Sequence, residues 1–441
     1  MTRLQVLIVG VLSAFATVGV LVAGVGASGI SGEDKAALSR QVTVAAASSS
    51  TPVEDDETTE SDASDDASAT DDAATDTAAA DDGAAAEEDV PVGDTDIDID
   101  EFDDTPDSTE GSGDTAAQTE APKPTKIKHV FVITLQGRGS DAAFGPASQA
   151  PYLAKELRPK GALLSKFQSL GKADLPDRLA LISGQPPNAA TRGNCATYQE
   201  IPASTKPDEA GDVTVDGCVY PNTITTLADQ VTSAGSVWKA YAEDLEKGPK
   251  GAVNCRRPVS NAVDDTQTGR PGDGYFARGN PFVYFHSLLD LSDCEANDGP
   301  LTALDADLAS AKKTPTLSYI APNLCNSGTE APCGLPEADA FLKTWVPKIL
   351  ASPAYKQDGL LVITFAGAAG ATTDAPAVNG TLLLSPFARA GDENKEELDP
   401  NALLRTIEDA LGYKALARAK KAPSLIPTTL AGARNIEPGD D

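Results

Sequence analysis

The chain has 441 residues and a formal net charge of −31, from 66 acidic and 35 basic residues. Between Glu54 and Glu120 lie 27 of the acidic residues and no lysine or arginine, so subtracting these charges leaves about −4 for the rest of the chain. The acidity therefore belongs to one segment and says little about what the folded part binds. We expect no nucleic-acid partner, because no basic patch with interleaved aromatic residues stands out.

Residues 1–30 are predicted to be an export segment. Arg3 is followed by an uncharged, mostly apolar run from Leu4 to Ala27, which is long enough to cross a bilayer as a helix. Val25 and Ala27 suit signal-peptidase cleavage, so both a cleaved signal peptide and a transmembrane anchor remain open. Either way we expect a chain exported across the cytoplasmic membrane, then anchored on its outer face or secreted.

Residues 31–124 are predicted to be a disordered linker. The segment consists mainly of Ala, Asp, Glu, Thr and Ser, as in DDASATDDAATDTAAADDGAAAEED, and it has almost no aromatic residues. Such a composition cannot bury enough apolar surface to offset the entropy lost on ordering. The folded part of the chain is therefore expected to follow this linker.

Residues 125–420 are predicted to form an α/β domain, with 421–441 as a flexible C-terminal tail. Short apolar runs rich in β-branched residues are typical of buried parallel strands. Four such runs are present: KIKHVFVITL (126–135), TLSYIAP (316–322), GLLVITFA (359–366) and TLLLSPFA (381–388). Helical patterns lie between them, which indicates a doubly wound, mostly parallel sheet with helices on both faces.

Three of the predicted helices have clear ends or spacing. TITTLADQVTSAG ends at Gly235, NALLRTIEDALG ends at Gly412, and EADAFLKTWVPKIL has apolar residues three and four apart. In sheets of this kind ligands bind beyond the carboxyl ends of the strands. The residues after Leu135 and Phe365 are therefore where chemistry is expected.

Six cysteines follow the linker and none precedes it. An even number in an exported chain favours three disulfides, and six cysteines allow 15 pairings. We prefer nearest-neighbour pairing, which joins Cys195 to Cys218, Cys255 to Cys294 and Cys325 to Cys333, although the sequence does not choose among the pairings. A zinc site is disfavoured, because the chain has no CxxC and only two histidines, His129 and His286.

Nine segments in order, from Lys126 to Gly412, resemble the phosphoesterase family of bacterial acid phosphatases and phospholipases C, within the alkaline-phosphatase superfamily. They are IKHVFVITL, APYLAKELRPKGALLSKF, LPDRLALISGQPP, TLADQVTSAGSVWKAYAED, GNPFVYF, SYIAPNLCN, FLKTWVPKILASPAY, LLVITF and LLRTIEDALG. The resemblance implies an alkaline-phosphatase-like fold. It also implies a mechanism in which bound metal ions hold the phosphate, a Ser or Thr hydroxyl attacks phosphorus, and acidic residues with histidine complete the site.

At the positions where the family places the residues of this mechanism, the chain has other residues. Where the family places Glu-Asn after the first strand, the chain has Gln136 and Gly137. Where the family places the nucleophile before Leu-Pro, the chain has Asp174, and the Asn expected after that proline is Asp177. A carboxylate can attack phosphorus, but without a metal the charges of Asp174 and Asp177 repel a phosphate.

The later positions are replaced as well. Ser327 and Thr329 lie where an Asp and a His are expected after NLCN, and Ala366 and Gly367 lie where Asp-Glu is expected after ITF. Alanine and glycine side chains cannot bind a metal. These losses predict that the chain needs no metal or other cofactor.

The last expected pair, Asp-His before LLRTIED, keeps Asp399 but has Pro400 in place of the histidine. The replaced residues predict a pseudoenzyme that binds or scaffolds at the cell envelope, with an envelope protein or polymer as its partner. Two alternatives stay open: an active phosphoesterase with a rearranged site, and a structural envelope protein in which the linker is the functional part.

One cluster near the lost nucleophile has two interpretations. Asp174, Asp177 and Arg178, with Asp141 and Gln136 nearby, can form a new polar pocket able to bind a cation or an amine. They can equally be residues that fill a defunct site.

Overall fold

The computed structural model describes residues 125–249, 251, 253–329, 331–369, 371 and 373–435. The predicted export segment 1–30 and linker 31–124 lie outside these residues. Within the described ranges, no helix has the length and apolar character that crossing a membrane requires.

The described residues build one sheet of eight strands in the order β4-β3-β5-β1-β6-β7-β2-β8. The strands are β1 (His129–Gln136), β2 (Ala162–Leu164), β3 (Trp238–Ala242), β4 (Asp298–Pro300), β5 (Leu317–Ala321), β6 (Gly359–Ala366), β7 (Thr381–Leu384) and β8 (Glu393–Asn394). All neighbours pair in parallel except β7, which is antiparallel to both β6 and β2. The predicted mostly parallel α/β sheet is confirmed.

The fourth apolar run was expected to be a parallel strand, and this expectation is wrong in direction. Thr381–Leu384 is buried as predicted, but it runs antiparallel to β6. No helix is described between the end of β6 and the start of β7, and a parallel neighbour needs a long crossover that is usually helical. The short connection therefore returns the chain in the opposite direction.

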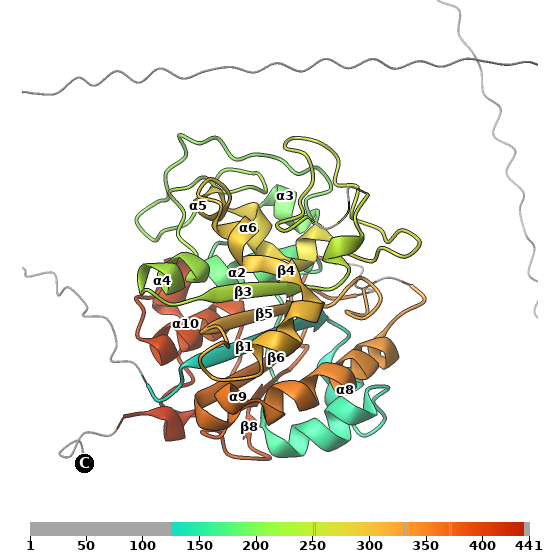
Figure 1. Cartoon of the computed structure of the whole chain (residues 1–441), viewed down its shortest axis with the longest axis vertical. Coiled ribbons are helices and arrows are strands. Elements are labelled where there is room, and N and C mark those ends of the chain that lie inside the picture. Colours follow the sequence, from blue (N-terminus) through green and yellow to red (C-terminus); the bar gives the residue numbers. More distant parts are fainter. Residues whose placement is uncertain are drawn as a thin grey trace, which may run out of the picture. The chain divides into compact units, whose positions relative to one another are not determined.

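Helices cover both faces of the sheet (Figure 1). The α-helices are α1 (Ser140–Phe144), α2 (Leu175–Ser183), α3 (Ala189–Arg192), α4 (Leu227–Ser233), α5 (His286–Leu289), α6 (Asp293–Asn297), α7 (Leu304–Asp307), α8 (Leu335–Ala351), α9 (Pro353–Asp358) and α10 (Pro400–Leu411). A π-helical turn spans Tyr152–Leu157, and 3₁₀ turns span Arg158–Lys160, Leu245–Lys247, Ala277–Gly279, Pro281–Tyr284, Leu301–Ala303, Ala417–Lys421 and Ala431–Ala433.

The alternation of side chains along β1 and β6 divides the core into two layers. Val130 and Val132 of β1 pack in one apolar cluster with α2, α4 and α10, whereas Phe131 and Ile133 pack in the other with α8 and α9. This follows from the twofold period of a strand, since both faces are buried. Gln136 and Ala366, at the ends of the two strands, stand opposite each other in the register.

The predicted helix ends at Gly235 and Gly412 are confirmed. Gly412 caps α10 in the left-handed conformation, with φ of 77°, and its N–H donates to the carbonyl of Glu408. Gly235 follows α4 with φ of 69°. Positive φ at these positions is accessible to glycine at little cost, which explains why each pattern ends there.

The predicted domain boundary at residue 420 is placed too early. Leu425, Leu430 and Ala433 are fully buried in the core, and the N–H of Lys126 donates to the carbonyl of Ala433. Residues 421–435 therefore pack on the domain as part of it, and the expected flexible tail is corrected for this stretch. Residues 436–441 lie outside the described ranges.

Three disulfides join neighbouring cysteines, which confirms the preferred pairing. They link Cys195 to Cys218, Cys255 to Cys294 and Cys325 to Cys333. The first two lie in the segment between α2 and β5, where they join residues 23 and 39 positions apart. The third closes the short loop that precedes α8.

Candidate functional site

The segments predicted to form the site do meet at the carboxyl ends of β1 and β6. The side chain of Gln136 donates from Nε2 to the carbonyl of Ala366 at 3.1 Å and accepts from the hydroxyl of Thr329 at 3.3 Å. Its backbone N–H donates to the carbonyl of Ser327 at 2.9 Å. Ser327 is buried, and its hydroxyl lies 2.8 Å from that of Thr329. Neutral amides and hydroxyls have thus replaced the expected charged ligands.

Backbone atoms occupy the space that ligand side chains need at two of these positions. A Cβ atom added at Gly137 would lie 2.1 Å from the carbonyl oxygen of Gly367 and 2.4 Å from the amide nitrogen of Asn379. A Cβ at Gly367 would lie 2.7 Å from the carbonyl oxygen of Lys172, and Gly367 has φ of +67°. Neither position accepts a larger residue unless the backbone moves.

Asn379 fixes this close approach, and nothing in the sequence pattern pointed to it. Its Nδ2 donates to the carbonyl of Gly367 at 2.7 Å, and its Oδ1 accepts from the N–H of Gly139. The side chain is almost fully buried. It fills the space between the two glycines that side chains such as Asn and Glu would otherwise enter.

Asp177 is buried on α2 and ties two loops to that helix. Its two carboxyl oxygens accept from the N–H groups of Leu170 and Gly367, at 2.6 and 2.7 Å. Burial raises the pKa of Asp177 to about 8, although the two backbone N–H groups oppose that rise. The group is therefore largely protonated at neutral pH and serves as a structural bridge.

Asp174, at the position where the nucleophile was expected, lies between two buried arginines. Its Oδ2 accepts from Arg178 at 3.4 Å, and its Oδ1 accepts from Nε of Arg278 at 3.2 Å. The guanidinium carbons of Arg178 and Arg278 lie 5.6 and 4.9 Å from the ring centroid of Phe276. The carboxylate is thus engaged on both oxygens and is not available to a bound cation or amine.

Arg278 is the second functional residue that sequence reasoning missed. It lies in the 3₁₀ turn Ala277–Gly279, and Nη1 donates to the backbone and side-chain oxygens of Gln267. Its position directly before the segment GNPFVYF is the one local feature that marks it in the sequence. Arg278 lies 104 positions after Asp174, so no local pattern joins them.

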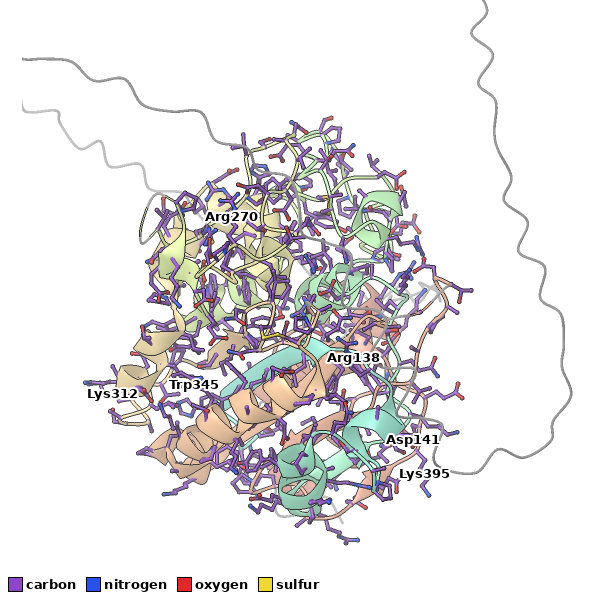
Figure 2. All side chains as sticks on the ribbon, turned by 90° about the vertical axis from the view of Figure 1, so that its right-hand side faces the viewer. Arg138, Asp141, Arg270, Lys312, Trp345 and Lys395 are labelled. Atoms are coloured by element: carbon purple, nitrogen blue, oxygen red, sulfur yellow. A yellow bond between two sulfur atoms is a disulfide. The ribbon has the colours of Figure 1, made fainter. Side chains whose placement is uncertain are left out.

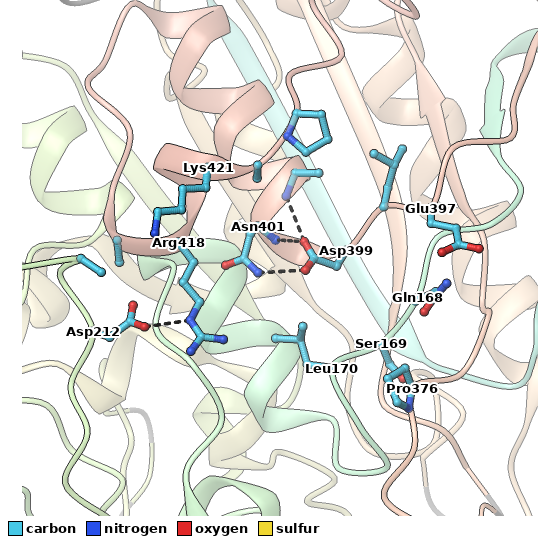
Figure 3. Close-up of a pocket in the computed structure, with 16 residues that line it drawn as sticks. Gln168, Ser169, Leu170, Asp212, Pro376, Glu397, Asp399, Asn401, Arg418 and Lys421 are labelled. Atoms are coloured by element: carbon cyan, nitrogen blue, oxygen red, sulfur yellow. Dashed lines mark hydrogen bonds and ion pairs between the residues drawn. The ribbon is translucent and has the colours of Figure 1, made fainter. Parts of the chain in front are cut away.

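Asp399 and Pro400 begin α10 and belong to that helix. Asp399 accepts from the N–H groups of Asn401 and Ala402 at 2.9 and 3.2 Å, as an N-cap residue does, and Pro400 takes the first helical position. Figure 3 shows Asp399 bonded within its own helix turn, with the ion pair of Arg418 and Asp212 across the cavity from it. The retained carboxylate has a helix-capping role.

Seven of the ten predicted positions line three different cavities. An inner cavity of about 10 Å³ is lined by Thr134, Phe167, Asp177, Leu181, Thr364, Phe365, Ala366, Pro400 and Leu403. An outer cavity of about 720 Å³ has Gln136, Asp174 and Thr329 in its wall. A third, of about 680 Å³, has Asp399 in its wall. The inner cavity has room for about one water, so it is far too small for a metal ion with a phosphate.

No group of three or more His, Cys, Asp or Glu side chains suited to a metal ion occurs among the described residues. Both histidines are engaged elsewhere. His129, at the start of β1, contacts Asp358 and the carbonyl of Ala311, and His286 contacts Glu200 and Asp290. The residues present at the strand ends therefore do not fit the metal ions of the mechanism described above.

The three-layer α/β domain, with its altered residues at the carboxyl edge of the sheet, defines the class of protein. The chain matches the Phosphoesterase family over residues 143–414, which is more than half of its length. It therefore belongs to the Phosphoesterase family, as the nine segments predicted.

Solved structures similar to this chain include members of the wider superfamily. A protein in the alkaline phosphatase superfamily from Vibrio parahaemolyticus has 14% identity, 73% of this chain and 75% of that chain covered, and a TM-score of 0.41. The phosphonate monoester hydrolase of Silicibacter pomeroyi has 12% identity, 71% and 78% covered, and a TM-score of 0.33.

The lipoteichoic acid synthase LtaP of Listeria monocytogenes has 10% identity, 68% and 78% covered, and a TM-score of 0.37. No curated protein matches the chain. Similarities this low carry no argument about what the chain does.

Proposed function

We propose that this chain is a catalytically inactive member of the Phosphoesterase family, a pseudoenzyme that binds or scaffolds at the cell envelope. The observation that carries the proposal is the packing of Gly137 against Gly367. The family's Glu-Asn and Asp-Glu pairs belong here, yet a single Cβ at either glycine meets a backbone oxygen at 2.1 or 2.7 Å. Ligand loss is thus accompanied by closure of the space that the ligands occupied.

The state of Asp174 supports the same conclusion. A carboxylate nucleophile needs a free oxygen that faces the phosphorus atom. Asp174 is 2% exposed, and its two oxygens accept from Arg178 and Arg278. Attack by Asp174 would break a buried ion-pair network at a site whose described residues hold no metal cluster.

Export and tethering complete the proposal. The apolar segment 1–30 would carry the chain across the cytoplasmic membrane and either anchor it on the outer face or be removed, and 31–124 would space the domain from the membrane. Three disulfides support an oxidising compartment, where such bonds persist. The partner in this setting would be an envelope protein or polymer.

Turnover and metal content test the loss of catalysis. Full-length chain, purified in detergent, is assayed on 4-nitrophenyl phosphate and bis(4-nitrophenyl) phosphate with Mg²⁺, Ca²⁺, Mn²⁺ or Zn²⁺ added, beside the Asp174→Ala variant. We expect no turnover above the rate of the variant and no stoichiometric metal by elemental analysis. Turnover that disappears in Asp174→Ala, or one tightly bound metal per chain, would instead establish an active phosphoesterase.

A deletion distinguishes binding by the domain from a function of the linker. Removal of residues 55–120 keeps both the export segment and the domain. If the domain is the functional part, cells carrying this deletion behave as wild type while cells lacking 125–435 do not. A defect caused by the linker deletion alone would favour the structural envelope protein. Protease treatment of intact cells, which should cleave the exported chain, tests its location.

A further inference from the structure

His286 lies where two loops, each closed by a disulfide, contact each other. Glu200 belongs to the loop of residues 195–218, and His286 belongs to the loop of residues 255–294. Arg270 marks the second loop in Figure 2, in the upper part of the view above the sheet. A contact between Glu200 and His286 therefore connects two loops that are separate in the sequence.

Both ring nitrogens of His286 contact carboxylates. Nε2 lies 2.8 Å from Oε2 of Glu200, and Nδ1 lies 2.8 Å from Oδ1 of Asp290, the residue that follows α5. An ionised carboxylate only accepts hydrogen bonds, so both nitrogens must carry a proton to satisfy the two contacts. The geometry therefore requires the charged imidazolium form of His286.

The surroundings of His286 favour the same charged form. Burial alone would lower its pKa, but the hydrogen bonds to Asp290 and Glu200, together with their charges, outweigh burial and raise the pKa above its ordinary value of 6.5. Within the described ranges, His286 is the one cation at ion-pair distance from either carboxylate. Its charge is thus what holds the two acids together.

The elements packed against α5 do not supply another cation. Their titratable groups are acidic or phenolic, namely Asp229 of α4, Asp293 and Glu295 of α6, and Tyr284 of the 3₁₀ turn Pro281–Tyr284. Asp229 accepts from the hydroxyl of Ser287 at 2.9 Å, and Glu295 is paired with Arg257 at 3.3 Å. Loss of the proton from His286 would therefore leave Glu200 and Asp290 without a neutralising partner from these elements.

Glu200 extends the contact to a third segment. Its Oε1 accepts from the hydroxyl of Ser260 at 2.6 Å, while its Oε2 is the oxygen that faces His286. The segment around Ser260 carries Val259 and Val263, each of which is 75% exposed. The position of Glu200 therefore affects how this exposed apolar segment is held.

We propose that Glu200, His286 and Asp290 form a pH-sensitive link between the two disulfide-closed loops. Below pH 6.5 the ring is protonated and the link is intact. As pH rises through the pKa of His286 in the folded chain, the ring loses a proton, and one nitrogen then faces a carboxylate with no hydrogen between them. The three side chains are a quarter to a half exposed, so the expected result is local loosening without unfolding.

NMR of the full-length chain with isotope-labelled histidine tests the charge state of the ring. The chain has two histidines, so two ring signals are expected, and His129→Gln assigns them. The His286 signal should titrate with a midpoint above 6.5, and this midpoint should fall in Glu200→Gln and in Asp290→Asn. Glu209→Gln removes the same charge at an exposed position of the first loop and should leave the midpoint unchanged.

Hydrogen exchange read by mass spectrometry tests the loosening. After correction for the pH dependence of intrinsic exchange, residues 198–201 and 256–263 of wild type should be less protected at pH 8 than at pH 6, and β1 should be equally protected at both. His286→Gln cannot titrate, so the two segments should show the same protection at both pH values.

Two results would overturn the proposal. The first is a His286 midpoint at or below 6.5, or one that moves as far in Glu209→Gln as in Glu200→Gln, since His286 would then not be held in its charged form by Glu200. The second is equal protection of both segments at the two pH values in wild type, which would show that the loops stay closed when the ring loses its proton.

Discussion

Asp174, the N-cap residue of α2, lines the outer cavity and Asp177, in the first turn of that helix, lines the inner one, yet the two cavities differ in size and in lining. The inner cavity, lined in part by Asp177, Ala366 and Pro400, measures about 10 Å³ and is surrounded mainly by apolar side chains. The outer cavity, beside Asp174, measures about 720 Å³ and carries an excess of cations. The residues at the carboxyl ends of β1 and β6 thus close the interior, whereas the adjoining cavity is open and lined mainly by cationic and polar side chains.

From this comparison we expect the largest loss of folding stability when Asp174, in the wall of the outer cavity, is replaced. Asp174→Ala leaves the buried guanidinium groups of Arg178 and Arg278 without their carboxylate. We expect a loss of about 3–5 kcal/mol in the free energy of unfolding, as for other buried pairs that lose one partner. Urea denaturation of the full-length chain measures it.

Asp141→Ala is the control for this experiment, because Asp141 is exposed on α1 and removes the same charge. It should change stability by less than about 0.5 kcal/mol. An Asp174→Ala variant as stable as Asp141→Ala would mean that the arginines do not depend on Asp174, and the description of the wall would be wrong.

The closure of the interior is tested by Gly137→Ala. The added Cβ would lie 2.1 Å from the carbonyl oxygen of Gly367, and the backbone on that side is held by Asn379. We expect a loss of about 3 kcal/mol, at the upper end of overpacking effects. Gly299→Ala is the matched control, because a Cβ at Gly299 meets nothing within 4 Å.

Introducing the family's acidic pair at residues 366 and 367 also tests the closure of the interior. The double variant Ala366→Asp with Gly367→Glu returns the family's residues, but Gly367 has φ of +67° and backbone atoms within 3 Å of a Cβ. The variant should be destabilised and should still fail to hydrolyse 4-nitrophenyl phosphate. Recovered turnover in a stable double variant would show that the backbone closure is readily reversed.

Asp177 makes the stability of the interior depend on pH. Its pKa in the folded chain is raised to about 8, from 3.8 for the free group, so the folded state binds a proton that the unfolded state has released at pH 5 to 7. Stability therefore falls as pH rises through this window, by about 3 kcal/mol from this group. Asp177→Asn, which cannot titrate, should remove that part of the slope.

The measurement is the free energy of unfolding at pH 5, 6 and 7 by urea denaturation. Asp141→Asn, at an exposed position, should keep the wild-type slope. Because burial also raises the pKa of Glu408 to about 9 and that of Asp298 to about 7, some slope will remain in Asp177→Asn. An unchanged slope in that variant would contradict the assignment of the proton to Asp177.

The fold was predictable because its information is local and periodic. The apolar runs at β1, β5 and β6 and the glycines that end α4 and α10 each act through neighbouring residues. The direction of β7 was missed, since apolar pattern reports burial and not strand direction. The burial of Leu425 and Leu430 was missed because this short stretch lacks a helical or strand period.

The site was predictable only as far as the family resemblance reached. The resemblance identified Ala366 and Gly367 as positions where an acidic pair is expected. It could not show that the backbone at Gly367 packs against Gly137, since that contact depends on the distant Asn379. Arg278 was missed for the same reason, as it meets Asp174 only through the fold. Asp399 could have been recognised, because Asp-Pro-Asn before an apolar helical pattern is itself an N-cap signal.

Asp399 provides the smallest and most specific test, since it lines neither the inner nor the outer cavity. As the N-cap of α10 it accepts from the N–H groups of Asn401 and Ala402, so Asp399→Ala should cost about 1 kcal/mol of stability. Asp399→Ser, which keeps a capping oxygen, should recover most of that loss. Urea denaturation of both variants measures these two effects. A loss in Asp399→Ser as large as that in Asp399→Ala would contradict the capping role, because serine keeps an oxygen that can accept from the N–H groups of the first turn.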